Sequence, residues 1–260
     1  MAWISRFYKQ ADLGTTDAGT HVSVRYQPVA QAENDALTGT QHLVAAVDWI
    51  EKTIGAYQFG TEVGPVSAPW FGRGMEHHPF WHVADDSMRD ELAQVHEAAH
   101  GWFGNGLRLA CWEDFVFSEG TVSYLAARAL DEVGASGVAQ QAWSGYESAL
   151  ARGAGTPVNP WPEGCGQADI LSNGQYGFAN GGFSSYTYAA GALFFRALEQ
   201  KIGRPALDEA LHTFYVKWLG RAAHFQDLLD AVQASSGYDP NSCAKHWLRG
   251  TVPPAITECE

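Results

Sequence analysis

The sequence predicts an α+β fold that is mainly helical, in which residues 1–95 form a small strand-containing lobe and residues 96–260 a helical lobe of one domain. Apolar residues recur at helical spacing through most of the chain after residue 88. Before that point, alternating runs are interrupted by Gly and Pro. A length of 260 residues and an apolar share of 46% are sufficient for a substantial core.

The elements of the first lobe follow from two kinds of periodicity. Residues 21–29 alternate between apolar and polar in the manner of a strand, and residues 41–57 have the apolar stripe of an amphipathic helix. The segment that follows, up to residue 86, is broken by Gly and Pro and predicts short strands and turns.

In the second lobe, the periodicity predicts a series of helices. The first runs from Met88 to Asn105, with Gly104 as its stop signal. Further helices are expected at 118–134, 138–153, 186–203, 205–219 and 224–235. Residues 153–184 are rich in Gly, Asn and Pro and predict a long loop, and a loop of that length in a compact domain is usually functional.

Composition and charge exclude several classes of protein. The formal net charge of −13 repels phosphate backbones, and no basic stripe reverses it locally, so nucleic acid is not expected as a partner. No apolar run approaches the ~20 residues that cross a bilayer, so no membrane partner is expected either. The first residues lack the apolar core of a signal peptide, which leaves the compartment open.

The four cysteines, at positions 111, 165, 243 and 259, contain no CxxC pair, which argues against a zinc cluster of thiolates. Two disulfides are one interpretation, and Cys243–Cys259 is the simpler pair because it closes a short loop. Four buried free thiols are the alternative. Paired cysteines would be consistent with a secreted or periplasmic protein.

The stretch "QVHEAAHGWFGN" (94–105) contains the pattern HExxH. Residues four apart lie on one face of a helix, so the imidazoles of His96 and His100 can converge on one metal ion. Glu97 projects at a different angle and can hold a water beside the metal. The alternative is a buried helix that carries histidines by chance.

A catalytic zinc needs a third protein ligand and one open position. Glu119 is the candidate, because it follows His100 after 18 residues and lies in the first turn of the next expected helix. Two antiparallel helices joined by residues 106–117 would bring Glu119 opposite the histidines. A carboxylate at a helix N-terminus also interacts favourably with the helix dipole, which is the structural alternative.

These motifs resemble the gluzincin zinc aminopeptidases, the family of aminopeptidase N and leukotriene hydrolase. "VHEAAHGWFGN" and the later "SEG" (118–120) match its zinc motif, HExxH followed after eighteen residues by Glu. "GRGMEHHPF" (72–80) resembles its GAMEN segment, and "FSSYTYAAGALFFRALEQKIG" (183–203) the segment that carries a tyrosine. The resemblance covers about residues 20–255 and implies a thermolysin-like, two-lobed metallopeptidase domain.

The resemblance implies a role for each matching position. His96, His100 and Glu119 correspond to the ligands of one Zn²⁺ per chain. Glu97 corresponds to the general base that activates the zinc-bound water. Tyr188 corresponds to the tyrosine that hydrogen-bonds the oxyanion, a task for which a phenol of pKa about 10 is suited. Without the resemblance, Tyr188 reads as a half-buried tyrosine at a helix start.

Glu76 corresponds to the carboxylate that receives the free α-ammonium of the substrate, with His77 beside it in the substrate-binding segment. From the residues alone, Glu76 reads as a surface carboxylate at a strand edge. The segment departs from the family because it reads "RGMEH", so His77 replaces the usual asparagine. A second metal at His77 and His78 is not favoured, since adjacent side chains in a strand point to opposite faces.

Asp114 corresponds to a family aspartate before the third ligand, and is expected to accept the outer N–H of a zinc-bound histidine. Two other positions depart from the family pattern, "SEGTV" in place of "NEGFA" and Ala190 two residues after Tyr188. Members of the family normally carry an N-terminal β-rich domain, and often further helical domains. The chain is therefore expected to be an excised catalytic domain or a reduced member.

The leading hypothesis is a zinc aminopeptidase that hydrolyses the N-terminal peptide bond of peptides with a free N-terminus. The alternatives are an endopeptidase or epoxide hydrolase with the same zinc residues, and a non-catalytic binding domain stapled by zinc. Structural zinc sites usually close all four positions with protein ligands. Three expected ligands plus a base favour catalysis.

Overall fold

In the computed structural model, residues 7–69, 73–111, 114–155 and 185–248 are described, together with Thr251, Pro253, Glu258 and Cys259. These residues cluster into two compact units. The first unit comprises residues 1–106 and 125–142, and the second residues 107–124 and 143–260. Helix α4 (Phe115–Glu132) contributes its first part to the second unit and its last part to the first.

The first unit is built on a six-stranded mixed sheet with the order β1-β2-β4-β6-β5, in which β3 also pairs with β2. The strands are β1 (Lys9–Thr15), β2 (His21–Tyr26), β3 (Glu62–Val63), β4 (Val66–Ala68), β5 (Gly74–Met75) and β6 (His82–Ala84). Strands β2, β4 and β6 are parallel, while β1 and β5 run antiparallel at the two edges. Strand β5, which precedes Glu76, is therefore an edge strand.

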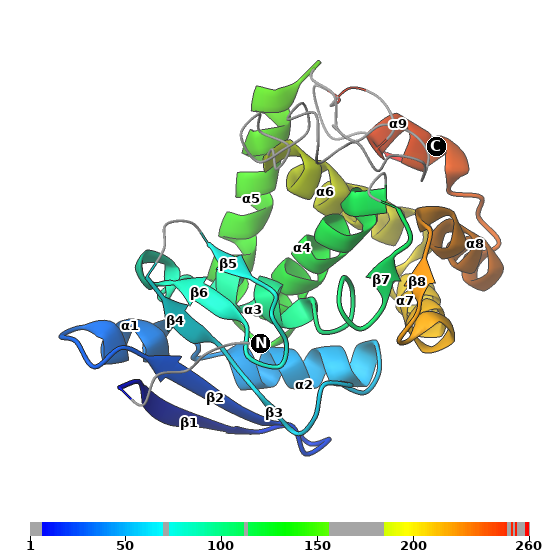
Figure 1. Ribbon diagram of the computed structural model, residues 1–260. Helices are drawn as coiled ribbons and strands as arrows, with labels where there is room; N and C mark the ends of the chain where they lie inside the picture. The colour runs from blue at the N-terminus through cyan, green and yellow to red at the C-terminus, as the bar shows by residue number, and fades with distance from the viewer. Residues whose placement is uncertain are drawn as a thin grey trace, which may run out of the picture. The chain divides into compact units, whose positions relative to one another are not determined.

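Helices α1 (Ala32–Gly39) and α2 (Leu43–Thr53) pack on the strands β1 and β2 (Figure 1). Helix α2 forms because apolar residues recur along one face, and Leu43, Val47 and Ile50 are buried. Its Glu51 is buried too, and its two carboxylate oxygens accept hydrogen bonds from the hydroxyls of Thr16 and Thr20, each at 2.6 Å. These bonds satisfy a carboxylate that would otherwise be costly to bury.

The zinc-motif helix of the first unit is α3 (Glu91–Ala99), which follows the short 3₁₀ helix η1 (Asp85–Ser87) and packs against α2 and β5. The predicted helix over 88–105 is therefore too long at both ends. Asp90 starts α3 because its side chain accepts a hydrogen bond from the backbone N–H of Ala93 at 3.1 Å. Beyond Ala99, tertiary contacts of the segment 101–106 replace the helix.

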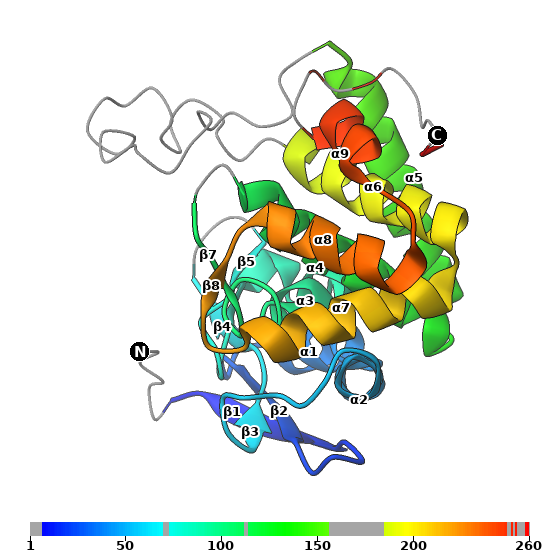
Figure 2. The ribbon, with the colours of Figure 1, turned by 90° about the vertical axis from the view of Figure 1, so that its right-hand side faces the viewer.

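The second unit is mainly helical. Its elements are β7 (Arg108–Leu109), the first part of α4, most of α5 (Ser136–Gly153), α6 (Ser185–Ile202), α7 (Arg204–Trp218), β8 (Ala222–Ala223), α8 (Phe225–Ser236) and α9 (Asn241–Leu248). Figure 2 shows α7 and α8 side by side, and α9 next to α6. A two-stranded parallel sheet joins β7 to β8. The predicted α+β, mainly helical fold is confirmed.

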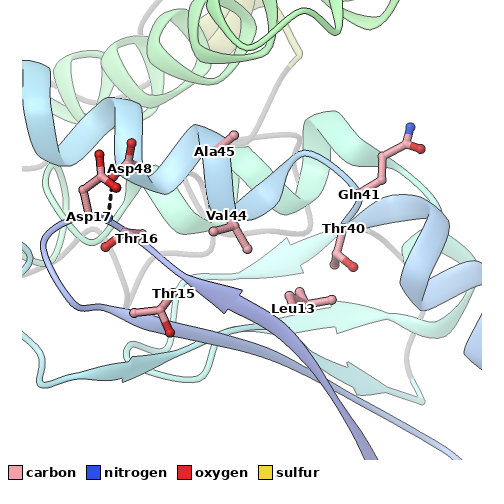
Figure 3. Close-up of a pocket in the computed structure, with 9 residues that line it drawn as sticks. All are labelled: Leu13, Thr15, Thr16, Asp17, Thr40, Gln41, Val44, Ala45 and Asp48. Atoms are coloured by element: carbon pink, nitrogen blue, oxygen red, sulfur yellow. Dashed lines mark hydrogen bonds between the residues drawn. The ribbon is translucent and has the colours of Figure 1, made fainter.

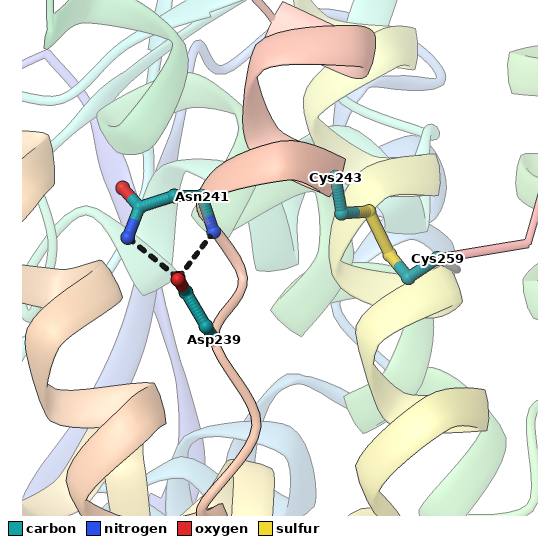
Figure 4. The surroundings of a disulfide bond; sticks show 4 residues. All are labelled: Asp239, Asn241, Cys243 and Cys259. Carbon is teal, nitrogen blue, oxygen red and sulfur yellow. Dashed lines mark hydrogen bonds between the residues drawn. A yellow bond between two sulfur atoms is a disulfide. The ribbon is translucent and has the colours of Figure 1, made fainter.

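A disulfide joins Cys243 of α9 to Cys259 near the end of the chain, with the two Cα atoms 5.1 Å apart (Figure 4). This pair confirms the simpler of the sequence-based interpretations, and Cys111 is disulfide-bonded as well. Helix α9 begins after Asp239, whose carboxylate accepts hydrogen bonds from the backbone and side chain of Asn241. These bonds lower the pKa of Asp239.

The strand at 21–29 and the helices at 41–57, 118–134, 138–153, 186–203, 205–219 and 224–235 are confirmed, with ends that differ by a few residues. The sequence did not predict β1, α1 or α9. Most of the loop expected at 153–184 lies outside the described residues. Within the described part of the chain, no helix is both long and apolar enough to cross a membrane.

Candidate active site

The two histidines of the motif HExxH lie at the carboxyl end of α3. His96 is half-buried in the last turn, and His100 follows the helix but keeps helical torsion angles (φ −60°, ψ −19°). Their rings lie edge to face, with a centroid distance of 5.0 Å and an interplanar angle of 81°. The i, i+4 spacing therefore brings two imidazoles to one face, as predicted.

A hydrogen bond determines which nitrogen of His100 faces a metal. Its Nδ1 lies 2.9 Å from the carbonyl oxygen of Phe103, which only accepts, so Nδ1 carries the proton and donates. Nε2 is then left with a lone pair for a metal. The ligand atoms that His96 and His100 could offer to a metal lie within 4.8 Å of each other. With Zn–N bonds of about 2.0–2.1 Å, small side-chain rotations bring both onto one ion, so the pair fits zinc.

Two carboxylates lie beside His100 in the same unit. The ligand atoms of Glu76, Glu97 and His100 are all within 4.8 Å of one another. Glu97 is 5% exposed and His100 is 1% exposed, so this group is held mostly away from solvent. The backbone carbonyl of Glu76 accepts a hydrogen bond from the side-chain amide of Asn105, which ties the segment after β5 to the loop after α3.

Gly74 explains how β5 approaches the zinc helix so closely. A Cβ at this position would lie 2.5 Å from Oε1 of Glu97 and 2.6 Å from its Cγ. Such distances are far below van der Waals contact, so a side chain at Gly74 would displace the Glu97 carboxylate. The backbone of β5 thus packs directly against the predicted general base.

His78 is bound through both ring nitrogens. Nε2 lies 2.9 Å from the backbone carbonyl of Glu97, and Nδ1 lies 2.7 Å from the hydroxyl of Tyr57. Burial lowers the pKa of His78 to about 3, and the nearby His100 acts in the same direction, while the bond to the Glu97 carbonyl opposes them. His78 is therefore neutral at physiological pH.

His77 has different partners from His78. It is exposed, and its Nδ1 lies 2.9 Å from Nδ1 of His82 on β6. Burial, and then the charge of His77, lower the pKa of His82. The two adjacent histidines lie after β5 and not in a strand, and they engage separate groups. A contact of His77 with substrate stays a prediction.

In the second unit, Glu119 and Tyr188 lie on the packed helices α4 and α6. Glu119 is buried in the first turns of α4, and Tyr188 is half-buried near the start of α6. The ring of Tyr188 packs edge-on against Phe115, one turn before Glu119, at a centroid distance of 6.2 Å. The meeting of Glu119 and Tyr188 with the two histidines of the first unit stays a prediction.

Two glycines set the distance between α4 and α6. A Cβ on Gly120 would lie 2.6 Å from the Cα of Gly191, and a Cβ on Gly191 would overlap the Cα of Gly120. The two helix backbones therefore touch at this point. Because Gly120 follows Glu119 directly and Gly191 lies one turn after Tyr188, the contact fixes the relative position of these two predicted site residues.

Asp114 is buried just before α4, and its Oδ2 lies 3.1 Å from Nδ1 of His224. The sulfur of Cys111 lies 3.6 Å from the same His224 nitrogen. These three residues have the spacing of a metal site, but Cys111 is disulfide-bonded and offers no thiolate. The predicted bond from a zinc-bound histidine to Asp114 stays a prediction.

A surface pocket of the first unit lies between β1 and α2 and contains none of the predicted site residues (Figure 3). Its acidic members, Asp17 and Asp48, both bind the ammonium group of Lys52, at 2.5 and 2.6 Å. The remaining polar lining is hydroxyl and amide, from Thr15, Thr16, Thr40 and Gln41. The structure therefore separates this pocket from the histidine and carboxylate group.

Residues 82–247 match the family model described as the peptidase family M1 domain. The chain belongs to peptidase family M1. The resemblance to zinc aminopeptidases is thereby confirmed, and the match includes the HExxH helix, Glu119 and Tyr188.

Among the curated relatives, the human aminopeptidase RNPEPL1 is 28% identical over 270 residues, which cover 94% of this chain and 35% of that protein. The leukotriene A-4 hydrolase homolog of Botryotinia fuckeliana is 26% identical over 222 residues, covering 76% of this chain and 33% of that protein. The chain thus spans about a third of the length of these two relatives.

Solved structures of family M1 share this fold. The M1 zinc metallopeptidase of Deinococcus radiodurans aligns with a TM-score of 0.72 at 20% identity, over 97% of this chain and 54% of that one. A mutant of that enzyme bound to a Tyr-Ser-Ala substrate aligns with a TM-score of 0.71 over 96% of this chain. The likeness establishes the M1 peptidase fold for this chain.

Sequence reasoning missed the residues that pack against the predicted site residues. Tyr57, His78 and Gly101 contact the end of α3, and Gly120 and Gly191 meet in the second unit. The only local signal for the second group is a glycine on each of two helices, where glycine is normally unfavourable. No local signal marks Tyr57 or His78.

Proposed function

We propose that this chain is the catalytic domain of a zinc aminopeptidase that hydrolyses the first peptide bond of peptides with a free N-terminus. His96, His100 and Glu119 hold one Zn²⁺ per chain. When bound, the ion polarises the scissile carbonyl and makes a nearby water more acidic. The fit of the two imidazoles to zinc and the spacing of Glu119 support this ligand set.

The residues of the chain divide the remaining work. Glu97 lies between the two histidines in sequence but is not a ligand, and it takes the proton of the attacking water and passes it to the leaving amine. Tyr188 donates a hydrogen bond to the oxygen of the tetrahedral intermediate. Asp114 accepts a hydrogen bond from the outer N–H of a ligand histidine. His77 lines the substrate-binding segment next to Glu76.

The position of Glu76 carries the proposal of an aminopeptidase in preference to an endopeptidase. Its carboxylate lies within 4.8 Å of the ligand atoms of both Glu97 and His100. In a peptide, the α-nitrogen is only two bonds, about 2.5 Å, from the first carbonyl carbon. A carboxylate this close to the base therefore suits an α-ammonium next to the bond that is hydrolysed. An internal peptide bond places no charge there.

Acetylating the substrate tests this role of Glu76. The acetyl group removes the positive charge and leaves the carboxylate without a partner, which costs several kcal/mol in a partly buried site. We expect kcat/KM for a free-amine peptide to exceed that of its acetylated form by at least about a hundredfold. Glu76→Ala should reduce this ratio, mainly by lowering the value for the free-amine peptide.

Metal analysis accompanies these kinetics. We expect one zinc per chain in the wild type and in Glu76→Ala, and a loss of zinc in His100→Ala. A wild-type ratio near one with zinc bound would show an endopeptidase or another hydrolase. Bound zinc without hydrolysis of any aminoacyl amide or blocked peptide would show a binding domain.

A further inference from the structure

The carboxyl end of α3 is where its backbone leaves the helical hydrogen-bond pattern. The N–H of Gly101 donates to the carbonyl of Ala98 at 3.0 Å, one residue later than the i−4 pattern of an α-helix. The carbonyl oxygen of Glu97 instead accepts a hydrogen bond from Nε2 of His78, at 2.9 Å. A side chain from the segment after β5 thus replaces a bond of the helix at the residue that carries the predicted base.

The donor and acceptor atoms of His78 follow from its partners. The carbonyl oxygen of Glu97 can only accept, so Nε2 of His78 carries the proton. Nδ1 is then the acceptor, and the hydroxyl of Tyr57 donates to it at 2.7 Å. Tyr57 therefore fixes the tautomer in which His78 donates to Glu97.

The imidazole of His78 is enclosed by aromatic rings. Tyr57, Phe59 and Trp81 lie with their ring centroids 5.3 to 5.6 Å from that of His78. Gly101 allows this approach, because a Cβ there would lie 2.6 Å from Cε2 of Tyr57 and 3.0 Å from Cε1 of His78. The ring is thus held against the end of α3 by packing as well as by hydrogen bonds.

We propose that His78, oriented by Tyr57, is a positioning residue for the M1 site, because it holds the backbone of Glu97 and so places the carboxylate of Glu97 and the imidazole of His100. This inference rests on the proposed function. A displacement of about 1 Å at reacting groups is enough to cost about a hundredfold in rate. The same stretch of backbone carries His100, a proposed zinc ligand, and groups that orient a metal ligand contribute about 10- to 100-fold to metal affinity.

Three substitutions separate hydrogen bonding from packing. His78→Phe keeps an aromatic ring against Tyr57 and Trp81 but removes the donor to Glu97. His78→Gln restores an N–H donor at about the reach of Nε2. Tyr57→Phe keeps its ring and removes the hydroxyl that orients His78. His21→Phe is the matched control, since His21 is a histidine of the same unit that binds Asp12 on the edge strand.

Zinc affinity, measured by competition with a chelator, is the readout that does not depend on turnover. For His78→Phe we expect affinity to fall about tenfold, with altered d–d bands in the Co²⁺-substituted protein. Hydrolysis of an aminoacyl amide should show kcat lowered at least tenfold, and KM changed less than about threefold, because positioning acts on the reacting groups. His78→Gln should recover most of the zinc affinity and most of kcat. Tyr57→Phe should lower each of them a few-fold.

The inference is overturned if His78→Phe binds zinc and turns over like the wild type, or if His78→Gln is no better than His78→Phe at equal thermal stability. If His78→Phe does not fold, Tyr57→Phe is the deciding variant. Wild-type zinc affinity and kcat in Tyr57→Phe would then overturn the positioning role of Tyr57 and His78. If the wild type hydrolyses no aminoacyl amide, the proposed function fails, and the zinc affinities of the same series still test the positioning role.

Discussion

In the first unit, the segment that carries Glu97 and His100 is held by side chains that donate hydrogen bonds, from Tyr57 through His78 to the Glu97 carbonyl. In the second unit, Glu119 and Tyr188 are held by direct contact between helix backbones at Gly120 and Gly191. The first arrangement depends on particular hydrogen-bond donors and acceptors, and the second on the absence of a side chain at the two glycines. Conservative polar substitutions should therefore matter in the first unit, and added volume in the second.

The largest expected effect is the loss of kcat in Glu97→Gln, a substitution in the first unit. The amide keeps the size of the side chain but cannot accept the proton of the attacking water, so we expect kcat to fall about a thousandfold. Zinc content should stay at the wild-type level, because Glu97 is not among the proposed ligands. Near-normal turnover in this variant would contradict the role of Glu97 as the base.

In the second unit, Gly191→Ala should destabilise the protein by about 3 kcal/mol, because the new Cβ overlaps the Cα of Gly120 and forces α4 and α6 apart. Gly145→Ala, in α5, is the matched control. A Cβ there meets nothing within 4 Å, so we expect a gain of up to about 1 kcal/mol. Urea unfolding measures the change in unfolding free energy for both variants. Equal changes would show that the contact between Gly120 and Gly191 is not the cause.

Tyr188→Phe tests the chemistry of the second unit without adding volume. The ring still packs on Phe115, so stability should change little, while loss of one oxyanion donor should lower kcat about a hundredfold. Zinc binding should be unchanged. A rate within a few-fold of the wild type would remove Tyr188 from the mechanism.

The smallest expected effect concerns pH. His78 has a pKa of about 3 in the folded chain, against about 6.5 when unfolded. Between these values the unfolded chain binds the extra proton, so stability falls as the pH falls from about 6.5 towards 3. The slope is at most about 1.4 kcal/mol per pH unit, and solvent screening of the half-buried ring reduces it.

His78→Gln cannot bind this proton, so its unfolding free energy should fall less steeply than that of the wild type between pH 6.5 and 4.5. The penalty of Gly191→Ala should be equal at both pH values, because no titrating group takes part in the glycine contact. Parallel curves for the wild type and His78→Gln would argue against a His78 that stays neutral in the folded chain.

The parts of the site that the sequence predicts without the family resemblance are those that depend on spacing along the chain. The spacing of His96 and His100 is a property of helical geometry, so it needs no knowledge of the fold. His78 reaches the Glu97 carbonyl only because β5 pairs with β6 beside α3, and nothing near His78 in the sequence specifies that partner. The sequence alone therefore does not predict the contact of His78 with Glu97.

The end of the zinc helix shows the same limit. Gly104 is a valid stop signal, yet the helix ends at Ala99. Trp102 leaves the helix because its indole N–H donates to the carbonyl of Gly55 at 2.7 Å and its ring packs on Tyr57 at 5.5 Å. Tertiary contacts of this kind outweigh local propensity. The family resemblance supplied what local patterns did not, namely roles for Glu76 and Tyr188.

The disulfide between Cys243 and Cys259 affects how the proposed zinc site can be studied. Dithiol reductants bind zinc through their thiolates and also cleave disulfides by exchange. In this chain, inactivation by such a reagent would therefore mix two events, loss of the metal and release of the chain end from α9. A thiol-free chelator removes only the metal, and a phosphine reductant acts mainly on the disulfides. Storage buffers for this protein are best prepared without thiols.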